Sequence, residues 1–273
     1  MDLGLKGKRV VITGSSRGIG YAIAQAFLEE GARVLLNGVD KIRLAQAETE
    51  LQTADKRVSA FAADIASVEG TRRLFAEVDR LWDGRLDVCV NNAAIHEATD
   101  FTILDEDRWD QTVNMNLKSV YLCAQAAFER MSKQKTGGVI LNASSFAALI
   151  PAYPYGIYST TKAAIINMTR GMAAEFAPWN IRVNAYVPGF IATAMNAETI
   201  AKNGALAMSQ IALNRAGTVE EVAAPVVFLA SAKAGYISGA ALEISGGKFS
   251  VQNPKGNWDR AQRLAAEKDR PIT

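Results

Sequence analysis

The sequence predicts a single α/β domain in which a parallel sheet of about seven strands lies between two layers of helices. Short runs of β-branched and apolar residues alternate along the chain with longer segments whose apolar residues recur at helical spacing. The expected strands are apolar throughout, as in parallel strands that helices cover on both faces. A chain of 273 residues is long enough for one such three-layer αβα domain.

Seven strands are expected along the chain. The first, residues 9–13, reads RVVIT, and the fourth, residues 86–90, reads LDVCV. Short runs of this kind, separated by helical patterns, are typical of buried strands. The complete set is residues 9–13, 33–37, 58–62, 86–90, 138–143, 182–186 and 240–244.

Helices are expected between these strands. In the first helix, residues 18–30, the side chains of Ile19, Ile23 and Phe27 share one face. Gly31 then stands where a glycine commonly ends a helix. The remaining helices are expected at residues 41–53, 68–81, 106–133, 158–176 and 219–230.

The last residues of the chain differ from the rest in composition. We assign residues 1–247 to the domain and residues 248–273 to a C-terminal extension with a helix near residues 258–268. The extension carries six basic and three acidic residues, which favours a solvated appendage. A docked lid and a subunit clamp are the alternatives.

Composition excludes several functional classes. With 49% hydrophobic and 21% charged residues, the chain is neither disordered nor fibrous. Its net charge of +2 provides no basic field for nucleic acid or for an anionic membrane. No apolar run approaches the ~20 residues that span a bilayer, and the first residues lead us to expect no secretory signal. Cys89 and Cys123 fit no disulfide or zinc pattern, so we expect a cytoplasmic protein without a metal site.

A glycine-rich turn follows the first expected strand. It reads Thr-Gly-Ser-Ser-Arg-Gly-Ile-Gly, with glycines at positions 14, 18 and 20. Glycine lets the backbone turn tightly and approach a ligand closely. The helix that opens there presents free N–H groups and a partial positive charge to a pyrophosphate. The turn therefore predicts a dinucleotide cofactor, although a plain strand-to-helix turn would also contain glycine.

Residues after the second strand bear on which nicotinamide cofactor binds. An acidic side chain there would bind a ribose hydroxyl and repel a 2′-phosphate, but the expected position is Gly38. Arg17 in the turn is suited to pair with a 2′-phosphate. Both points favour NADP(H), whereas Asp40 favours NAD(H) if its loop folds back.

Tyr158, Lys162 and Ser145 are the candidate catalytic residues. Tyr158 and Lys162 are four residues apart on an expected helix and share one face. Ser145 lies just past the fifth strand, where open α/β sheets bind ligands. A neighbouring ammonium favours phenolate, which suits a tyrosine to proton transfer near neutral pH. This set predicts alcohol–ketone interconversion with hydride transfer to or from a nicotinamide.

These motifs, in this order, resemble the short-chain dehydrogenase/reductase family over nearly all of residues 5–247. The resemblance implies a Rossmann-type doubly wound fold and an NAD(P)(H)-dependent oxidoreductase acting on a secondary alcohol or ketone. It implies that Tyr158 is the general acid/base, that Lys162 holds the nicotinamide ribose and lowers the tyrosine pKa, and that Ser145 holds the substrate oxygen. Asn116 would anchor a water that passes protons to solvent.

The resemblance also implies the cofactor contacts. The Asp64-Ile65 pair matches the family's adenine-side residues, and the segment from Asn91 to Ala94 resembles its Asn-Asn-Ala-Gly motif. Residues 188–193 match the loop that closes over the nicotinamide side. Besides Tyr158 and Lys162, the expected set is Gly14, Ser16, Arg17, Gly18, Ile19, Gly20, Asp64, Ile65, Asn91, Ala93, Pro188, Gly189, Ile191 and Thr193.

The substrate is not identified by these motifs. The sole histidine and several large side chains near the expected cleft are candidate contacts, namely His96, Phe146, Tyr155, Phe190 and Met195, and residues 192–210 are the expected mobile lid. Oxoacyl thioesters, sugars or polyols, cyclic diols or diketones, and steroids remain open as small carbonyl or alcohol substrates. The alternative function is a dinucleotide-sensing protein without chemistry. The resemblance implies a homotetramer, with a homodimer as the alternative.

Overall fold

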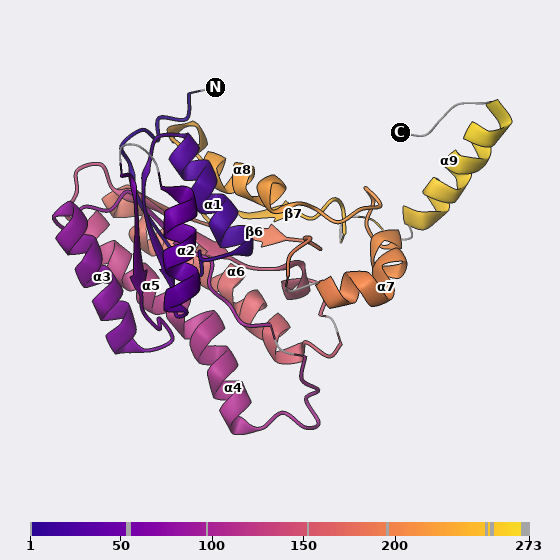
Figure 1. Ribbon diagram of the computed structural model, residues 1–273, viewed down its shortest axis with the longest axis horizontal. Helices are drawn as coiled ribbons and strands as arrows, with labels where there is room; N and C mark the ends of the chain where they lie inside the picture. The colour runs from indigo at the N-terminus through magenta and orange to yellow at the C-terminus, as the bar shows by residue number, and fades with distance from the viewer. Residues whose placement is uncertain are drawn as a thin grey trace.

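A computed structural model of the chain describes residues 2–52, 56–96, 98–151, 153–194, 197–248, 251 and 254–268. Figure 1 shows the strands at the centre of the molecule with helices on both sides. The sheet has the order β3-β2-β1-β4-β5-β6-β7, and all neighbouring strands are parallel. The strands are β1 (Arg9–Ile12), β2 (Arg33–Gly38), β3 (Val58–Ala62), β4 (Val88–Asn91), β5 (Gly138–Ala143), β6 (Ile181–Pro188) and β7 (Ala241–Ile244). This confirms the predicted doubly wound parallel sheet.

The strand order reverses between β1 and β4. The chain moves outward from β1 to β3 on one side, then returns and moves outward from β4 to β7 on the other. Open α/β sheets bind ligands outside the carboxyl ends of the strands at such a reversal. Gly14 follows β1 and Ala93 follows β4, so both lie at this point.

Two hydrophobic cores lie on opposite faces of the sheet. Val10 and Ile12 of β1 belong to one core, and Val11 between them belongs to the other, as the alternation of a strand requires. The first core is covered by α1 (Gly18–Glu29), α2 (Lys41–Leu51) and α8 (Val219–Ala230), and the second by α3 (Val68–Trp82), α5 (Ser119–Met131) and α6 (Gly156–Phe176). The three layers expected from the sequence are therefore present.

The long helix expected at residues 106–133 has an irregular centre. It consists of α4 (Glu106–Val113), a π-helical segment (Asn114–Lys118) and α5, which ends at Met131. A π-helical turn widens the helix locally and is frequent at functional sites. This segment contains Asn116, which is completely buried.

Several expected boundaries differ from the structure. The sixth strand is longer than residues 182–186, and β4 begins at Val88 rather than at 86. The segment 192–210 contains α7 (Ala197–Ser209), which the sequence analysis did not predict. Its sequence AETIAKNGALAMS has few large apolar residues, so helical periodicity is weak there.

The C-terminal extension is docked at its base. Its helix, α9 (Pro254–Lys268), starts before the expected residue 258 and projects beyond α7 in Figure 1. The Trp258 indole Nε1 donates a hydrogen bond of 2.8 Å to the Ala212 carbonyl. The docked alternative therefore describes the start of the extension better than a solvated appendage does.

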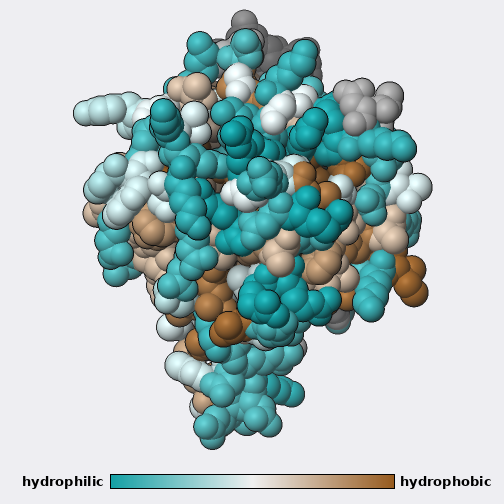
Figure 2. Space-filling view, turned by 90° about the vertical axis from the view of Figure 1, so that its left-hand side faces the viewer, coloured by the Kyte–Doolittle hydropathy of each residue, from teal (hydrophilic) through white to brown (hydrophobic). Residues whose placement is uncertain are grey.

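The outer surface of the helical layers is mostly polar. Figure 2 shows the left-hand side of Figure 1, where hydrophilic side chains cover most of the face and hydrophobic ones occur in small groups. Helices that pack on a sheet keep their polar faces toward water, which accounts for this pattern. Within the described ranges, no helix combines the length and the apolar character needed to cross a membrane.

Candidate active site

The glycine turn is packed against the segment that follows β4. Gly14 and Gly18 have φ of +62° and +59°, a backbone conformation that favours glycine. A Cβ on Gly14 would lie 2.7 Å from the Ala93 Cα. The Thr13 Oγ1 accepts hydrogen bonds from the backbone N–H groups of Asn92 and Ala93, at 3.0 and 3.1 Å. The glycine turn and the segment after β4 are thus packed against each other and joined by hydrogen bonds.

The N-terminus of α1 has no side-chain cap and borders the cavity. The helix begins at Gly18, and no side chain caps its first N–H groups. Gly20 packs so closely that a Cβ there would lie 2.3 Å from the Gly14 carbonyl oxygen. Unbonded N–H groups at a helix start, beside glycines without side chains, suit the pyrophosphate of a dinucleotide. The residues present therefore fit the pyrophosphate of a dinucleotide cofactor.

Tyr158 and Lys162 lie on α6, where Lys162 is buried and Tyr158 is partly buried. The Lys162 Nζ donates a hydrogen bond of 2.9 Å to the Ala143 carbonyl and lies 5.6 Å from the Tyr158 ring centroid. The Ser144 hydroxyl donates to the Lys162 carbonyl at 2.9 Å, which ties α6 to the end of β5. Burial lowers the pKa of Lys162 to about 7.

Ser145 and Tyr158 line the same part of the cavity, and Ser145 influences the pKa of the Tyr158 phenol. Burial raises the pKa of Tyr158, and Ser145 lowers it by a smaller amount. The net direction is opposite to the lowering expected from the sequence, because burial disfavours the phenolate. The Ser145 Oγ also accepts a hydrogen bond of 3.2 Å from the Ala147 backbone N–H, which fixes its position. Tyr158 is therefore a protonated donor at neutral pH.

The side chain of Asn116 is hydrogen-bonded to the backbone of Ile95. Its side-chain oxygen accepts from the Ile95 N–H at 2.8 Å, and its Nδ2 donates to the Ile95 carbonyl at 2.9 Å. Both polar groups of Ile95 are thus satisfied by one side chain in the π-helical segment. Asn116 therefore braces the loop that leads to His96.

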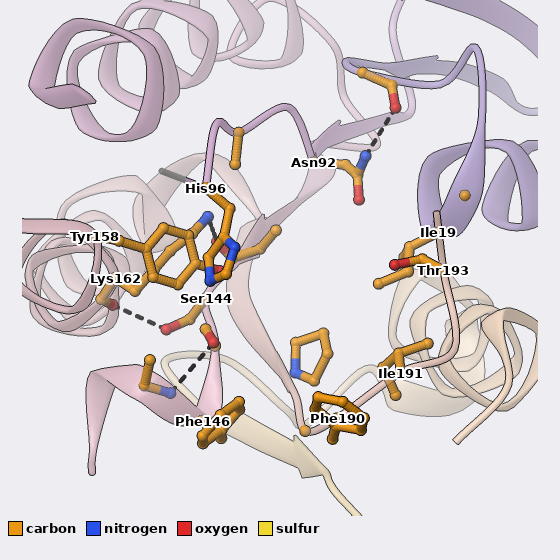
Figure 3. A pocket seen from close by; sticks show the side chains of 18 of the residues that line it. Ile19, Asn92, His96, Ser144, Phe146, Tyr158, Lys162, Phe190, Ile191 and Thr193 are labelled. Atoms are coloured by element: carbon orange, nitrogen blue, oxygen red, sulfur yellow. Dashed lines mark hydrogen bonds between the residues drawn. The ribbon is translucent and has the colours of Figure 1, made fainter. Parts of the chain in front are cut away.

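His96 lies against two tyrosines. Its ring stacks on Tyr155, with centroids 4.1 Å apart and planes 16° apart, and meets Tyr158 edge-on at 4.6 Å. Burial and, to a smaller extent, the charge of Lys162 lower the pKa of His96. A neutral imidazole offers one hydrogen-bond donor and one acceptor. Figure 3 shows His96, Tyr158 and Lys162 together on one side of the pocket, and Ile19, Ile191 and Thr193 on the other.

Comparisons with known proteins agree with this geometry. A family model described as "Enoyl-(Acyl carrier protein) reductase" matches residues 14–248. The chain is 35% identical to the 3-oxoacyl-[acyl-carrier-protein] reductase FabG of Thermotoga maritima, over 89% of this chain and 98% of that protein. It is 36% identical to the L-rhamnose 1-dehydrogenase (NAD(P)(+)) of Azotobacter vinelandii, with coverages of 89% and 96%.

A solved structure with a similar fold adds to these matches. The short-chain dehydrogenase/reductase SDR:Glucose/ribitol dehydrogenase from Brucella melitensis is 30% identical, with a TM-score of 0.86 over 91% of this chain and 99% of that one. This chain belongs to the short-chain dehydrogenase/reductase family. It is accordingly an NAD(P)(H)-dependent oxidoreductase that interconverts an alcohol and a carbonyl compound.

One cavity of this short-chain dehydrogenase/reductase, with a volume of about 1110 Å³, connects the glycine turn to Tyr158. It contains most of the residues expected to bind cofactor or substrate. Those that line it are Gly14, Ser16, Arg17, Gly18, Ile19, Gly20, Ile65, Ala93, His96, Ser145, Phe146, Tyr155, Tyr158, Lys162, Pro188, Gly189, Phe190, Ile191 and Thr193.

Three expected site residues do not line the cavity. Asn116 braces Ile95, as described above. The Asn91 Nδ2 donates to the Asn142 Oδ1 at 2.9 Å, which links β4 to β5. The exposed Asp64 accepts a hydrogen bond from the Ala66 N–H in the turn before α3. Met195 lies outside the described residues.

The sequence analysis missed other residues that line this cavity of the short-chain dehydrogenase/reductase. Arg43 is in the first turn of α2, and Lys248 follows the two glycines after β7. Val251 and residues 254–256 of the C-terminal extension also line it. A basic residue just beyond a strand end was the available signal for Arg43 and Lys248. Among the described residues, no cluster of histidine, cysteine, aspartate or glutamate could hold a metal ion.

Proposed function

We propose that Tyr158, Ser145 and Lys162 interconvert a secondary alcohol and a ketone beside a nicotinamide cofactor bound along the glycine turn. The observation that supports this most directly is their position in one cavity with the uncapped N-terminus of α1. When bound there, the cofactor supplies or accepts the hydride. Residues 1–247 would form the dinucleotide-binding catalytic domain, and residues 248–273 the extension.

Each polar side chain has a distinct task in this proposal. In ketone reduction, Ser145 and Tyr158 bind the carbonyl oxygen, and Tyr158 gives it the phenolic proton. In its ammonium form, Lys162 uses one of its three N–H donors on Ala143, which leaves two for the hydroxyls of a cofactor ribose. Asn116 is a positioning residue, because its contacts to Ile95 hold the loop that carries His96. The water relay through Asn116 remains a prediction.

We infer a preference for NADP(H) over NAD(H). Gly38 ends β2 without an acidic side chain, and Arg17 and Arg43 line the adjoining part of the cavity. The Asp40 Oδ1 accepts from the N–H groups of Ile42 and Arg43 as the N-cap of α2. Since these bonds hold Asp40 at the helix start, it is less suited to bind a ribose hydroxyl. Arg17 and Arg43 bring two positive charges to this part of the cavity, and Asp40 brings one negative charge. The net positive charge favours binding of the 2′-phosphate of NADP(H).

Assembly and location belong to the same set of proposals. The homotetramer implied by the family would place the helices that carry Asn116 and Tyr158 at an interface, and Trp109 and Tyr121 are exposed on α4 and α5. A homodimer is the alternative. The cytoplasmic location expected from the two cysteines remains a prediction.

A panel of ketones and alcohols tests the proposed function. We expect consumption of NADPH by at least one small ketone, measured by absorbance, and slower turnover with NADH. Binding of both cofactors without turnover by any member of a broad panel would support the alternative of a dinucleotide-sensing protein.

Arg17→Ala and Arg43→Ala test the cofactor preference. Each variant loses a charge-assisted contact to the 2′-phosphate, so kcat/KM for NADPH should fall about 10- to 100-fold. The value for NADH should stay within about twofold, because NADH lacks that phosphate. Arg72→Ala is the matched control, since Arg72 is exposed on α3 and pairs with Glu69. Equal losses with both cofactors would contradict the assignment.

A further inference from the structure

Lys248 is held at the wall of the cavity by the turn after β7. Gly246 and Gly247 both have positive φ, at +62° and +81°, which reverses the chain immediately before this residue. The Lys248 backbone N–H donates to the Ser245 Oγ at 3.0 Å. A Cβ on Gly247 would lie 2.7 Å from the Ala212 Cβ, so the turn packs directly against its neighbour. The backbone that carries the Lys248 side chain is therefore well fixed.

The ammonium group of Lys248 lies near the residue that follows the catalytic serine, although the two are far apart in the sequence. Its Nζ is 5.5 Å from the ring centroid of Phe146, the residue that follows Ser145. It donates a hydrogen bond of 2.6 Å to the Gln210 Oε1, at the end of the segment that contains α7. All three side chains line the cavity, and Figure 3 shows Phe146 and Phe190 in the lower part of the view.

Among the described residues, no carboxylate balances the charge of Lys248. None of the ion pairs among the described residues includes it, and its hydrogen-bond partner Gln210 is neutral. Glu243 accepts a hydrogen bond from Ser245 instead. Half-burial lowers the pKa of Lys248, which reflects the free energy of keeping this charge from water.

The cavity as a whole has an excess of positive charge. Of its described lining residues, Asp40 alone is acidic, and it caps α2 at the cofactor end. The basic lining residues are Arg17, Arg43, Lys162, Lys248 and Lys255, and Lys255 is paired with Asp259. Arg17 and Arg43 are assigned above to the cofactor, and Lys162 lies with Tyr158. Within the described part of the cavity, this leaves Lys248 as the cation without an ion-pair partner on the substrate side.

We propose that Lys248 and Gln210 bind a carboxylate of the substrate, so that the enzyme acts on an oxo acid or a hydroxy acid. This inference rests on the proposed function of Ser145 and Tyr158. The Lys248 Nζ retains further donors, and the Gln210 Nε2 is an amide donor beside it. Two adjacent donors match the two oxygens of a carboxylate. The Phe146 ring lies 5.5 Å from the Lys248 Nζ and lines the same cavity as the catalytic serine, so it would contact the carbon skeleton.

Matched acids and esters test the proposal. The probes are 2-, 3- and 4-oxo acids and their methyl esters, which differ only in the negative charge, assayed with NADPH. We expect the wild-type enzyme to prefer the acid of at least one pair. Lys248→Met should reduce kcat/KM for that acid about 10- to 100-fold, mainly through KM, as expected for loss of a charge-assisted hydrogen bond. The ester should change by less than about threefold, which also reports correct folding.

Lys233→Met provides the matched control, because Lys233 is exposed outside the cavity, and Lys248→Arg should retain the preference for the acid. A wild-type preference for the esters, or equal losses for acid and ester in Lys248→Met, would overturn the inference.

Calorimetric titration of the enzyme–NADP⁺ complex with the same oxo acids tests the carboxylate site separately from the proposed chemistry. Acid binding that Lys248→Met weakens, without turnover of any probe, would count against the proposed function alone. Absence of such binding would count against the carboxylate site.

Discussion

Tyr158→Phe is expected to lower kcat for carbonyl reduction by about 10²- to 10⁴-fold, the usual contribution of a positioned acid or base. The substitution removes one oxygen and keeps the ring that contacts His96 and lies beside Lys162. Binding of NADPH should therefore be nearly unchanged, and the loss should appear in the chemical step. Stopped-flow measurement of NADPH oxidation with a substrate from the panel separates the two effects.

Tyr236→Phe is the control for this variant, because Tyr236 is fully exposed and does not line the cavity. It should leave kcat unchanged within about twofold. Wild-type turnover by Tyr158→Phe would show that another group transfers the proton.

The pH dependence follows from the same residue. Since the pKa of Tyr158 is raised, the phenol keeps its proton at neutral pH and can donate it during reduction. Alcohol oxidation needs the deprotonated form, so kcat/KM for oxidation should rise as the pH increases above neutral. The reduction rate should fall only at higher pH, where the proton is lost. In Tyr158→Phe, the rise of the oxidation rate should disappear.

Gly20→Ala is expected to weaken NADPH binding by more than about 100-fold. The added Cβ would lie 2.3 Å from the Gly14 carbonyl oxygen and 2.5 Å from the Asn92 Nδ2. Because the first of these atoms is backbone, the phosphate-binding turn itself must move. Overpacking of this kind also costs about 1–3 kcal/mol in the free energy of unfolding. Calorimetric titration with NADPH and thermal unfolding measure the two effects.

Gly171→Ala is the matched control within a helix. A Cβ at Gly171 in α6 would meet nothing within 4 Å. Alanine favours the helix over glycine by about 0.5–1 kcal/mol, so this variant should have a raised Tm and unchanged NADPH binding. If Gly20→Ala bound NADPH as tightly as the wild type, the glycine turn would not be the cofactor site.

Local patterns accounted for the framework of this protein. The apolar runs at residues 9–13 and 138–143 form central strands because their side chains fill the cores on both faces of the sheet. The glycine turn is also a local property, since backbone conformation and the absence of Cβ atoms depend on the residues themselves. The spacing of Tyr158 and Lys162 places them one helical turn apart.

Other features depended on contacts between distant segments. The π-helical turn at Asn116 is stabilised by its pairing with Ile95, twenty-one residues earlier in the chain. The raised pKa of Tyr158 results from burial, which overrides the effect expected from a neighbouring lysine. Helix α7 has weak periodicity of its own and lies beside the docked start of the C-terminal extension.

The sequence alone was sufficient to predict the seven strands in order, the glycine turn and the tyrosine–lysine pair, because each depends on residues within a few positions of one another. Only the tertiary structure decided that Arg43, Lys248 and Gln210 line one cavity with Ser145 and Tyr158. These side chains come from α2, the turn after β7 and the segment following α7. Their convergence depends on how the sheet orders its strands and how the loops pack at the carboxyl ends, and spacing along the chain does not encode that packing.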